Sequence, residues 1–131
     1  METAGKKGFF MKKILIIDDE ELILELLKKM LEEEGHQVSV AVNGEDGLEM
    51  FRQYPADLVI TDMVMPVKDG LKTILELREI DEDVPVIAIS GGGTIAKERY
   101  LAIASHLDNV VTVAKPLSRA DILNAVRELL Y

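Results

Sequence analysis

The sequence predicts an α/β fold in which helices cover both faces of a five-stranded parallel sheet. Short apolar runs alternate with helical patterns five times, which is typical of such a sheet. The 131 residues fit one domain, and the alternation begins near Met11 and leaves no linker or second unit. We therefore expect one domain at residues 11–131. Residues 1–10 show no periodicity, and we interpret them as a tag or a disordered extension.

The predicted strands are five short apolar runs. The first, "KILII", contains four consecutive aliphatic residues, which indicates a strand buried on both of its faces. In chain order we expect strands at Lys13–Ile17, Gln37–Ala41, Leu58–Asp62, Val86–Ser90 and Val110–Ala114.

The helices between these strands are predicted from apolar residues at helical spacing. The first helix is followed by Gly35, a residue type that commonly ends helices, and its expected apolar stripe is Ile23, Leu26, Leu27, Met30 and Leu31. Three more helices are expected at about 44–53, 71–79 and 94–106. The last helix opens at Ser118, which stands three residues before Asp121 as in a capping box, and its stripe is Ile122, Leu123, Val126, Leu129 and Leu130.

Composition argues against several classes of function. With 15 Lys and Arg against 24 Asp and Glu, the net charge is -9, so we expect no direct binding to nucleic acid. The chain has no cysteine, which excludes thiolate metal sites and cysteine redox chemistry. Its two histidines, His36 and His106, lie away from the carboxyl ends of the predicted strands, so we expect them at the surface and not as ligands. No apolar run approaches the roughly 18 residues of a membrane span, and no secretory signal is evident. We therefore expect a cytoplasmic protein without a membrane partner.

Polar residues gather where four of the predicted strands end. Asp18 and Asp19 follow the first strand, Asp62 ends the third, Ser90 ends the fourth, and the fifth runs into Lys115. The carboxyl ends of parallel strands meet at one edge of a sheet, where ligands of such folds bind. We expect these five side chains to lie together.

The converging carboxylates predict a bound divalent cation. Two like charges about 4 Å apart repel by roughly 4 kcal/mol at an effective dielectric near 20, so something positive should lie between them. Carboxylate oxygens suit Mg²⁺. The alternative is that Asp18, Asp19 or Glu20 merely caps the following helix. That alternative leaves Asp62 unexplained, because Asp62 ends a different strand.

Four motifs occur in order along the chain: the acidic pair Asp18-Asp19, the segment "DMVMPVKDG" at residues 62–70, Ser90, and the pair Lys115-Pro116. Together they resemble the receiver domain of two-component response regulators. The resemblance spans residues 11–130 and implies the flavodoxin-like strand order 2-1-3-4-5. It implies that Asp62 is the phosphoacceptor and that Ser90 and Lys115 contact the phosphoryl group. It also implies a cis peptide bond at Lys115-Pro116 and a Mg²⁺ site made of Asp18, Asp19, Asp62 and the backbone carbonyl of Val64.

The resemblance further implies a signalling role within a phosphorelay. A histidine kinase or phosphotransfer protein would donate the phosphoryl group in a Mg²⁺-dependent step, and phosphorylation would switch a surface that binds a downstream protein. Asp62 needs no general base, because its carboxylate is already ionised near neutral pH. Such a chain is not an enzyme, although it assists its own phosphorylation and dephosphorylation. The sequence specifies neither the cognate kinase, the downstream partner nor the oligomeric state.

Three positions depart from the family pattern. Many receiver domains have Tyr or Phe where this chain has Thr112, so the aromatic part of the usual switch is absent. Neither the side chain of Val64 nor that of Gly92 can orient water beside Asp62.

Two alternative functions lack support in the sequence. An aspartyl-phosphate hydrolase of the DxD type would need an aspartate at the position of Val64. A flavodoxin-like FMN carrier is disfavoured by the acidic first loop and by the absence of tryptophan.

Overall fold

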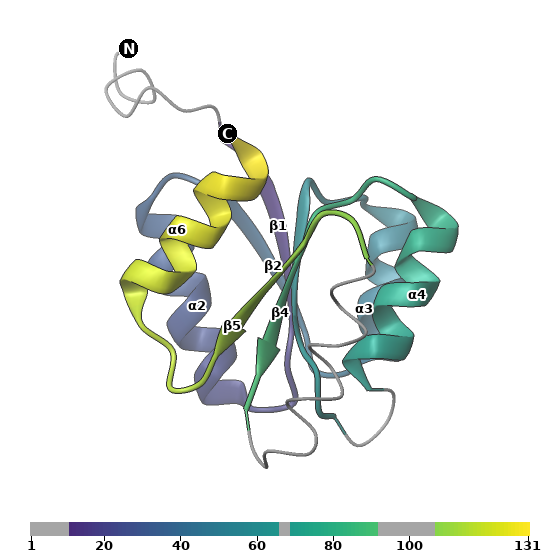
Figure 1. Ribbon diagram of the computed structural model, residues 1–131, viewed down its shortest axis with the longest axis horizontal. Helices are drawn as coiled ribbons and strands as arrows, with labels where there is room; N and C mark the ends of the chain where they lie inside the picture. The colour runs from purple at the N-terminus through teal and green to yellow at the C-terminus, as the bar shows by residue number, and fades with distance from the viewer. Residues whose placement is uncertain (1–10, 66–68, 92–106) are drawn as a thin grey trace.

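The computed structural model describes residues 11–65, 69–91 and 107–131, and it confirms the predicted parallel sheet (Figure 1). Its strands lie in the order β2-β1-β3-β4-β5, and each neighbouring pair is parallel. Their bounds match the predicted ones: β1 Lys13–Ile17, β2 Gln37–Ala41, β3 Leu58–Asp62, β4 Val86–Ser90 and β5 Val110–Ala114. None of the helices in the described part of the chain is both long and apolar enough to cross a membrane.

The side chains of β1 alternate between two hydrophobic cores, one on each face of the sheet. Ile14 and Ile16 pack into the first core, which the helices α2 (Glu21–Glu33) and α6 (Arg119–Leu130) cover. Leu15 and Ile17 pack into the second, under α3 (Gly44–Gln53) and α4 (Gly70–Ile80) on the other face (Figure 1). Successive residues of a strand point to opposite faces, so a strand between two helical layers must be apolar throughout.

The described helices begin and end where local sequence signals place them. Their bounds are α2 Glu21–Glu33, α3 Gly44–Gln53, α4 Gly70–Ile80 and α6 Arg119–Leu130. The side chains of Asn43, Asp69 and Ser118 each accept a hydrogen bond from a backbone N–H in the first turn of the helix that follows. Gly35 has φ 94°, the left-handed conformation that commonly ends a helix at glycine. The helix expected at 94–106 lies outside the described residues.

Two expectations about burial were wrong. On α2, Leu26 is 49% exposed, whereas Leu24, which is not part of the predicted stripe, is only 5% exposed. His36, expected at the surface, is buried, and its Nδ1 accepts a hydrogen bond of 3.3 Å from the backbone N–H of Lys12. Both errors arise because the surrounding sheet, rather than local periodicity, decides which side chains it covers.

The register of the sheet brings the predicted site residues to one edge. Ile17 pairs with Thr61, Asp62 pairs with Ile89, and Ser90 pairs with Ala114. The strand order reverses direction between β1 and β3, and ligands of open parallel sheets bind at such a point.

Candidate functional site

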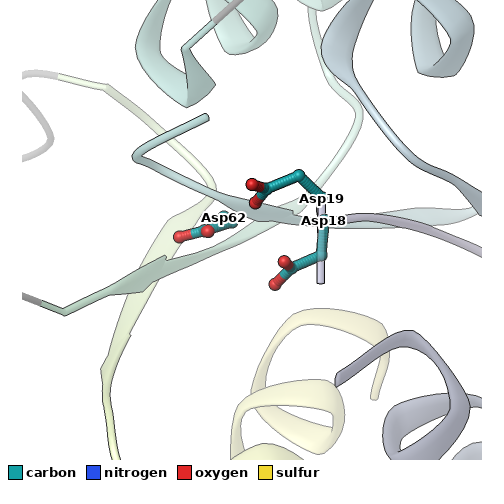
Figure 2. A group of neighbouring side chains, drawn as sticks. All are labelled: Asp18, Asp19 and Asp62. Carbon is teal, nitrogen blue, oxygen red and sulfur yellow. The ribbon is translucent and has the colours of Figure 1, made fainter. Parts of the chain in front are cut away.

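Three carboxylates converge beyond the ends of β1 and β3. Asp18, Asp19 and Asp62 each place one oxygen so that the three atoms lie within 4.8 Å of one another. Figure 2 shows the side chains coming from two neighbouring strands, with their carboxylates turned to the same side. The backbone N–H of Asp18 donates a 3.1 Å hydrogen bond to the carbonyl of Ala41, which fixes the end of β1 against β2. The cluster therefore stands on the rigid central strands of the sheet.

Asp18 is the most deeply buried member of the cluster, with no exposed surface. Its Oδ1 accepts a 2.8 Å hydrogen bond from the backbone N–H of Glu20, while its Oδ2 has no hydrogen-bond partner among the described residues. Burial, together with the negative charge of Asp62, raises the pKa of Asp18 from 3.8 to about 6. A buried carboxylate oxygen without a donor is costly unless a cation faces it.

Asp62 ends β3 and lies between the acidic pair and a lysine. Its Oδ2 is 3.7 Å from the Nζ of Lys115, and its Oδ1 accepts a long hydrogen bond of 3.4 Å from the backbone N–H of Val64. Burial raises the pKa of Asp62, and the positive charge of Lys115 partly opposes that rise. The carboxylate is held from two sides but is not fully neutralised by protein groups.

Lys115 reaches the site from the end of β5. Its backbone N–H donates a 2.8 Å hydrogen bond to the carbonyl of Ser90, and its peptide bond to Pro116 is cis, as the resemblance implied. Burial lowers the pKa of Lys115, but the charge of Asp62 and the hydrogen bond to Glu20 outweigh burial, so the pKa is raised overall. Lys115 therefore carries its positive charge at neutral pH.

Ser90 and Thr112 lie on the strands predicted for them, and Val64 follows the end of β3. Ser90 is buried at the end of β4, between the strand that carries Asp62 and the strand that leads to Lys115. Val64 projects an exposed side chain two residues beyond Asp62. Thr112 lies in β5 opposite Ala88 and is partly buried. Gly92 lies outside the described residues.

Gly70, the first residue of α4, packs closely against the backbone of the site. A Cβ atom at this position would collide with the backbone carbonyl oxygen of Asp62 and with the backbone of Met63. The backbone N–H of Gly70 also donates a 3.0 Å hydrogen bond to the carbonyl of Met63. The start of α4 is thereby packed directly onto the end of β3.

Sequence reasoning considered Glu20 only as a helix cap, and the structure shows otherwise. Glu20 occupies the N-cap position of α2 without making a side-chain capping bond. Its Oε1 lies 3.2 Å from the Nζ of Lys115. The signal in the sequence was the run of four acids after β1, of which only the first two were assigned to the site.

The residues of this edge fit a hard divalent cation. Three carboxylates face one ammonium group, and the Oδ2 atom of Asp18 is buried without a hydrogen-bond donor. Mg²⁺ prefers oxygen ligands of this kind and usually keeps several of its waters. A cation here would leave the Asp62 carboxylate flanked by positive charge on both sides, a setting suited to accepting an anionic group.

Comparison with known proteins gives these features a family context. The family model of the response regulator receiver domain matches the sequence over residues 14–127. The chain is 33% identical over 119 residues to the chemotaxis protein CheY of Halobacterium salinarum. The aligned region covers 91% of this chain and 97% of that protein. It spans about half the length of several other curated relatives, which are transcriptional regulators.

Solved structures agree with this match. A response regulator receiver domain protein from Clostridium thermocellum superposes with a TM-score of 0.79 at 32% identity, over 92% of this chain and 94% of that one. The receiver domain of the sensor histidine kinase PA1611 from Pseudomonas aeruginosa superposes with a TM-score of 0.78 at 21% identity, over 92% and 98% of the two chains. That structure has a magnesium ion coordinated in its active site cleft, and at this identity the likeness concerns the fold alone.

Proposed function

The chain belongs to the family of response regulator receiver domains, which are signalling domains of two-component systems, and we propose that its phosphoacceptor is Asp62. One observation carries the proposal, which is the setting of the Asp62 carboxylate. The Nζ of Lys115 lies 3.7 Å from Asp62 Oδ2, and Asp18 and Asp19 converge on the same carboxylate. Lys115 thus supplies positive charge where an anionic phosphoryl group would arrive, and the three carboxylates would hold a cation there.

The reaction transfers a phosphoryl group to the ionised carboxylate of Asp62. A carboxylate oxygen forms a bond to phosphorus, the bond from phosphorus to the donor atom breaks, and its electron pair leaves with the donor. No proton has to be removed from Asp62, so alignment and charge neutralisation dominate catalysis. The hydrogen bond from the N–H of Val64 and the ion pair with Lys115 orient the carboxylate.

Asp18, Asp19, Asp62 and the backbone carbonyl of Val64 would hold Mg²⁺ in this proposal. The bound ion supplies charge neutralisation for the incoming phosphoryl oxygens. Support comes from the buried Oδ2 of Asp18, which lacks a donor, and from the magnesium ion in the Pseudomonas aeruginosa receiver domain.

Ser90 and Lys115 are proposed to contact the transferred group. The Lys115 ammonium already lies beside the acceptor carboxylate, and Ser90 ends the strand next to Asp62. Neither residue would act as a base. Their role is to stabilise the phosphoryl oxygens through a charge and a hydroxyl donor.

The remaining parts of the proposal concern domain limits and partners. Residues 11–131 form the receiver domain, residues 1–10 an extension, and the site works in the cytoplasm. The donor is a histidine kinase or phosphotransfer protein, and a downstream protein binds the phosphorylated form. Val64, an exposed aliphatic residue, stands where a DxD hydrolase would need its acid-base aspartate, so that alternative gains no support.

The test is the intact mass of the protein after incubation with acetyl phosphate and Mg²⁺. We expect one added phosphoryl group on the wild-type chain and none on Asp62→Asn, because the amide has no anionic oxygen to attack phosphorus. Asp69→Asn is the matched control, since Asn can still accept the capping hydrogen bond from the N–H of Lys72. Full labelling of the Asp62→Asn protein would refute the assignment.

A further inference from the structure

Glu20 and Lys115, which are far apart in the sequence, form an ion pair across the site. They are 95 residues apart in sequence, and their Oε1 and Nζ atoms are 3.2 Å apart. Lys115 lies farther from Asp62, at 3.7 Å. In the unphosphorylated protein the closer partner of the ammonium is therefore Glu20 rather than the phosphoacceptor.

The side chain of Glu20 is available for this contact because it does not cap its own helix. The residue stands at the N-cap of α2 in an extended conformation, with φ -94° and ψ 110°, and makes no side-chain capping bond. The backbone N–H of Glu20 itself donates a hydrogen bond to the side chain of Asp18. The Glu20 carboxylate is thus directed to Lys115 and makes no capping bond to the backbone of α2.

The stem of Lys115 packs closely against Gly91, which leaves no room for a larger side chain there. A Cβ atom on Gly91 would lie 2.8 Å from the Cδ of Lys115 and 3.2 Å from its Cβ and Cγ. The backbone of Lys115 is fixed by its hydrogen bond to the Ser90 carbonyl. Because the Nζ of Lys115 already lies 3.2 Å from Glu20 and 3.7 Å from Asp62, a change of partner requires only a small movement of the ammonium.

The two partners differ in exposure, and phosphorylation changes their balance. The Glu20 side chain is 58% exposed, which weakens its attraction through solvent screening, whereas the Asp62 side chain is 6% exposed. A phosphoryl group brings about -1.5 to -2 charges and three strong acceptor oxygens to Asp62. Attraction toward the phosphorylated residue then exceeds the pull of a half-exposed carboxylate.

We propose that Glu20 is a positioning residue that holds Lys115 in the unphosphorylated protein and releases it when Asp62 carries a phosphoryl group. The inference rests on the proposed function of Asp62. Because the Glu20 contact stabilises only the unphosphorylated form, it opposes phosphorylation. Removing it should favour binding of a phosphoryl mimic by about two- to five-fold, the size expected for an ion pair with partly exposed partners.

The test compares Glu20→Gln and Glu20→Ala with the charge-matched control Glu21→Gln. Glu21 is exposed in the first turn of α2, so its replacement removes the same formal charge one residue along. Beryllofluoride, which mimics the phosphoryl group, is titrated at saturating Mg²⁺ while the amide signal of Ser90 is followed. We expect both Glu20 variants to bind it two- to five-fold more tightly, and Glu21→Gln to stay near the wild type.

A second readout follows the contact itself. In the wild-type protein, beryllofluoride should shift both the Lys115 ammonium signal and the side-chain carboxyl carbon of Glu20. In Glu20→Ala without beryllofluoride, the Lys115 ammonium signal should already differ from that of the wild type. The melting temperature of the free protein should fall only slightly, because the lost ion pair has partly exposed partners and Glu20 makes no capping bond.

The failures of the two proposals are distinguishable. If the wild type binds beryllofluoride but the Glu20 variants match Glu21→Gln, or the Glu20 carboxyl signal does not respond, the positioning role is wrong and the phosphoacceptor assignment stands. If the wild type neither binds beryllofluoride nor is labelled by acetyl phosphate, both proposals are refuted.

Discussion

Asp18 and Asp19 are adjacent residues of the same type, yet they have opposite environments. Asp18 is fully buried and makes a hydrogen bond to the backbone, whereas Asp19 is exposed. The sequence identified both as site residues, because two acids follow a buried strand. It could not tell which one is buried, since that depends on how the ends of β2 and β3 pack around the turn. The two residues should therefore respond differently to pH and to substitution.

The buried carboxylate predicts a pH dependence of stability in the metal-free protein. The pKa of Asp18 is raised from 3.8 to about 6, so the folded state binds this proton more tightly than the unfolded chain. The stabilisation is fully present below pH 3.8 and is lost as the pH rises through about 6. In chelator, the free energy of unfolding should fall over this window, and the fall should be smaller for Asp18→Asn. Parallel pH profiles for the two proteins in urea denaturation would contradict this explanation.

The same residue predicts opposite effects of one substitution with and without Mg²⁺. Without metal, Asp18→Asn should raise the melting temperature, because it removes a buried charge beside Asp62. With metal, the wild type should gain about 2.7 kcal/mol at a Mg²⁺ concentration 100 times its Kd, and the variant should lose most of that gain. Asp69→Asn, a cap replacement outside the cluster, should keep the full gain. A wild-type melting temperature indifferent to Mg²⁺ would argue against a preformed metal site.

At the scale of elements, the strands were predictable and the helix faces were less so. Five apolar runs and their boundaries could be identified because a strand between two helical layers is apolar throughout. On α2, apolar residues occur on more than one side, with Leu22 and Leu26 exposed and Leu24 and Leu27 buried. Periodicity alone does not choose among these faces, because the choice depends on where the sheet lies. The position of Lys115 beside Asp62 likewise depends on the β3-β4-β5 neighbourhood.

The contact between α4 and β3 predicts that Gly70→Ala impairs phosphorylation. The added Cβ would collide with the backbone carbonyl of Asp62, so the end of β3 or the start of α4 must shift. We expect a destabilisation of about 1–3 kcal/mol, typical of overpacking, and slower labelling by acetyl phosphate.

Gly47→Ala in α3 provides the comparison for this prediction. Its Cβ would collide with the end of the Ile17 side chain, which can move, and no backbone atom of the site is involved. Its labelling rate should stay near that of the wild type once both proteins are compared below their melting temperatures. Equal labelling rates for Gly70→Ala and Gly47→Ala would contradict the proposed link between α4 and the phosphoacceptor.

For the whole molecule, the decisive feature is the point where strand order reverses. The order β2-β1-β3-β4-β5 places the ends of β1 and β3 side by side, so that Asp18 and Asp19 meet Asp62 across neighbouring strands. The sequence located the polar residues at strand ends, but the strand order came from the family resemblance, because periodicity does not encode it. The receiver family model matches residues 14–127, and the sheet and its helices extend from Lys13 to Leu130, so the two cover nearly the same part of the chain.

We expect Asp62 alone to carry the phosphoryl group, and chemical mapping of the acyl phosphate distinguishes it from the neighbouring aspartates. Borohydride reduces an aspartyl phosphate to homoserine, which marks the modified position for tandem mass spectrometry. After treatment with acetyl phosphate and Mg²⁺, we predict homoserine at position 62 and intact aspartate at positions 18 and 19. Homoserine at position 18 or 19, or its absence from position 62 in protein whose intact mass shows phosphorylation, would contradict the account.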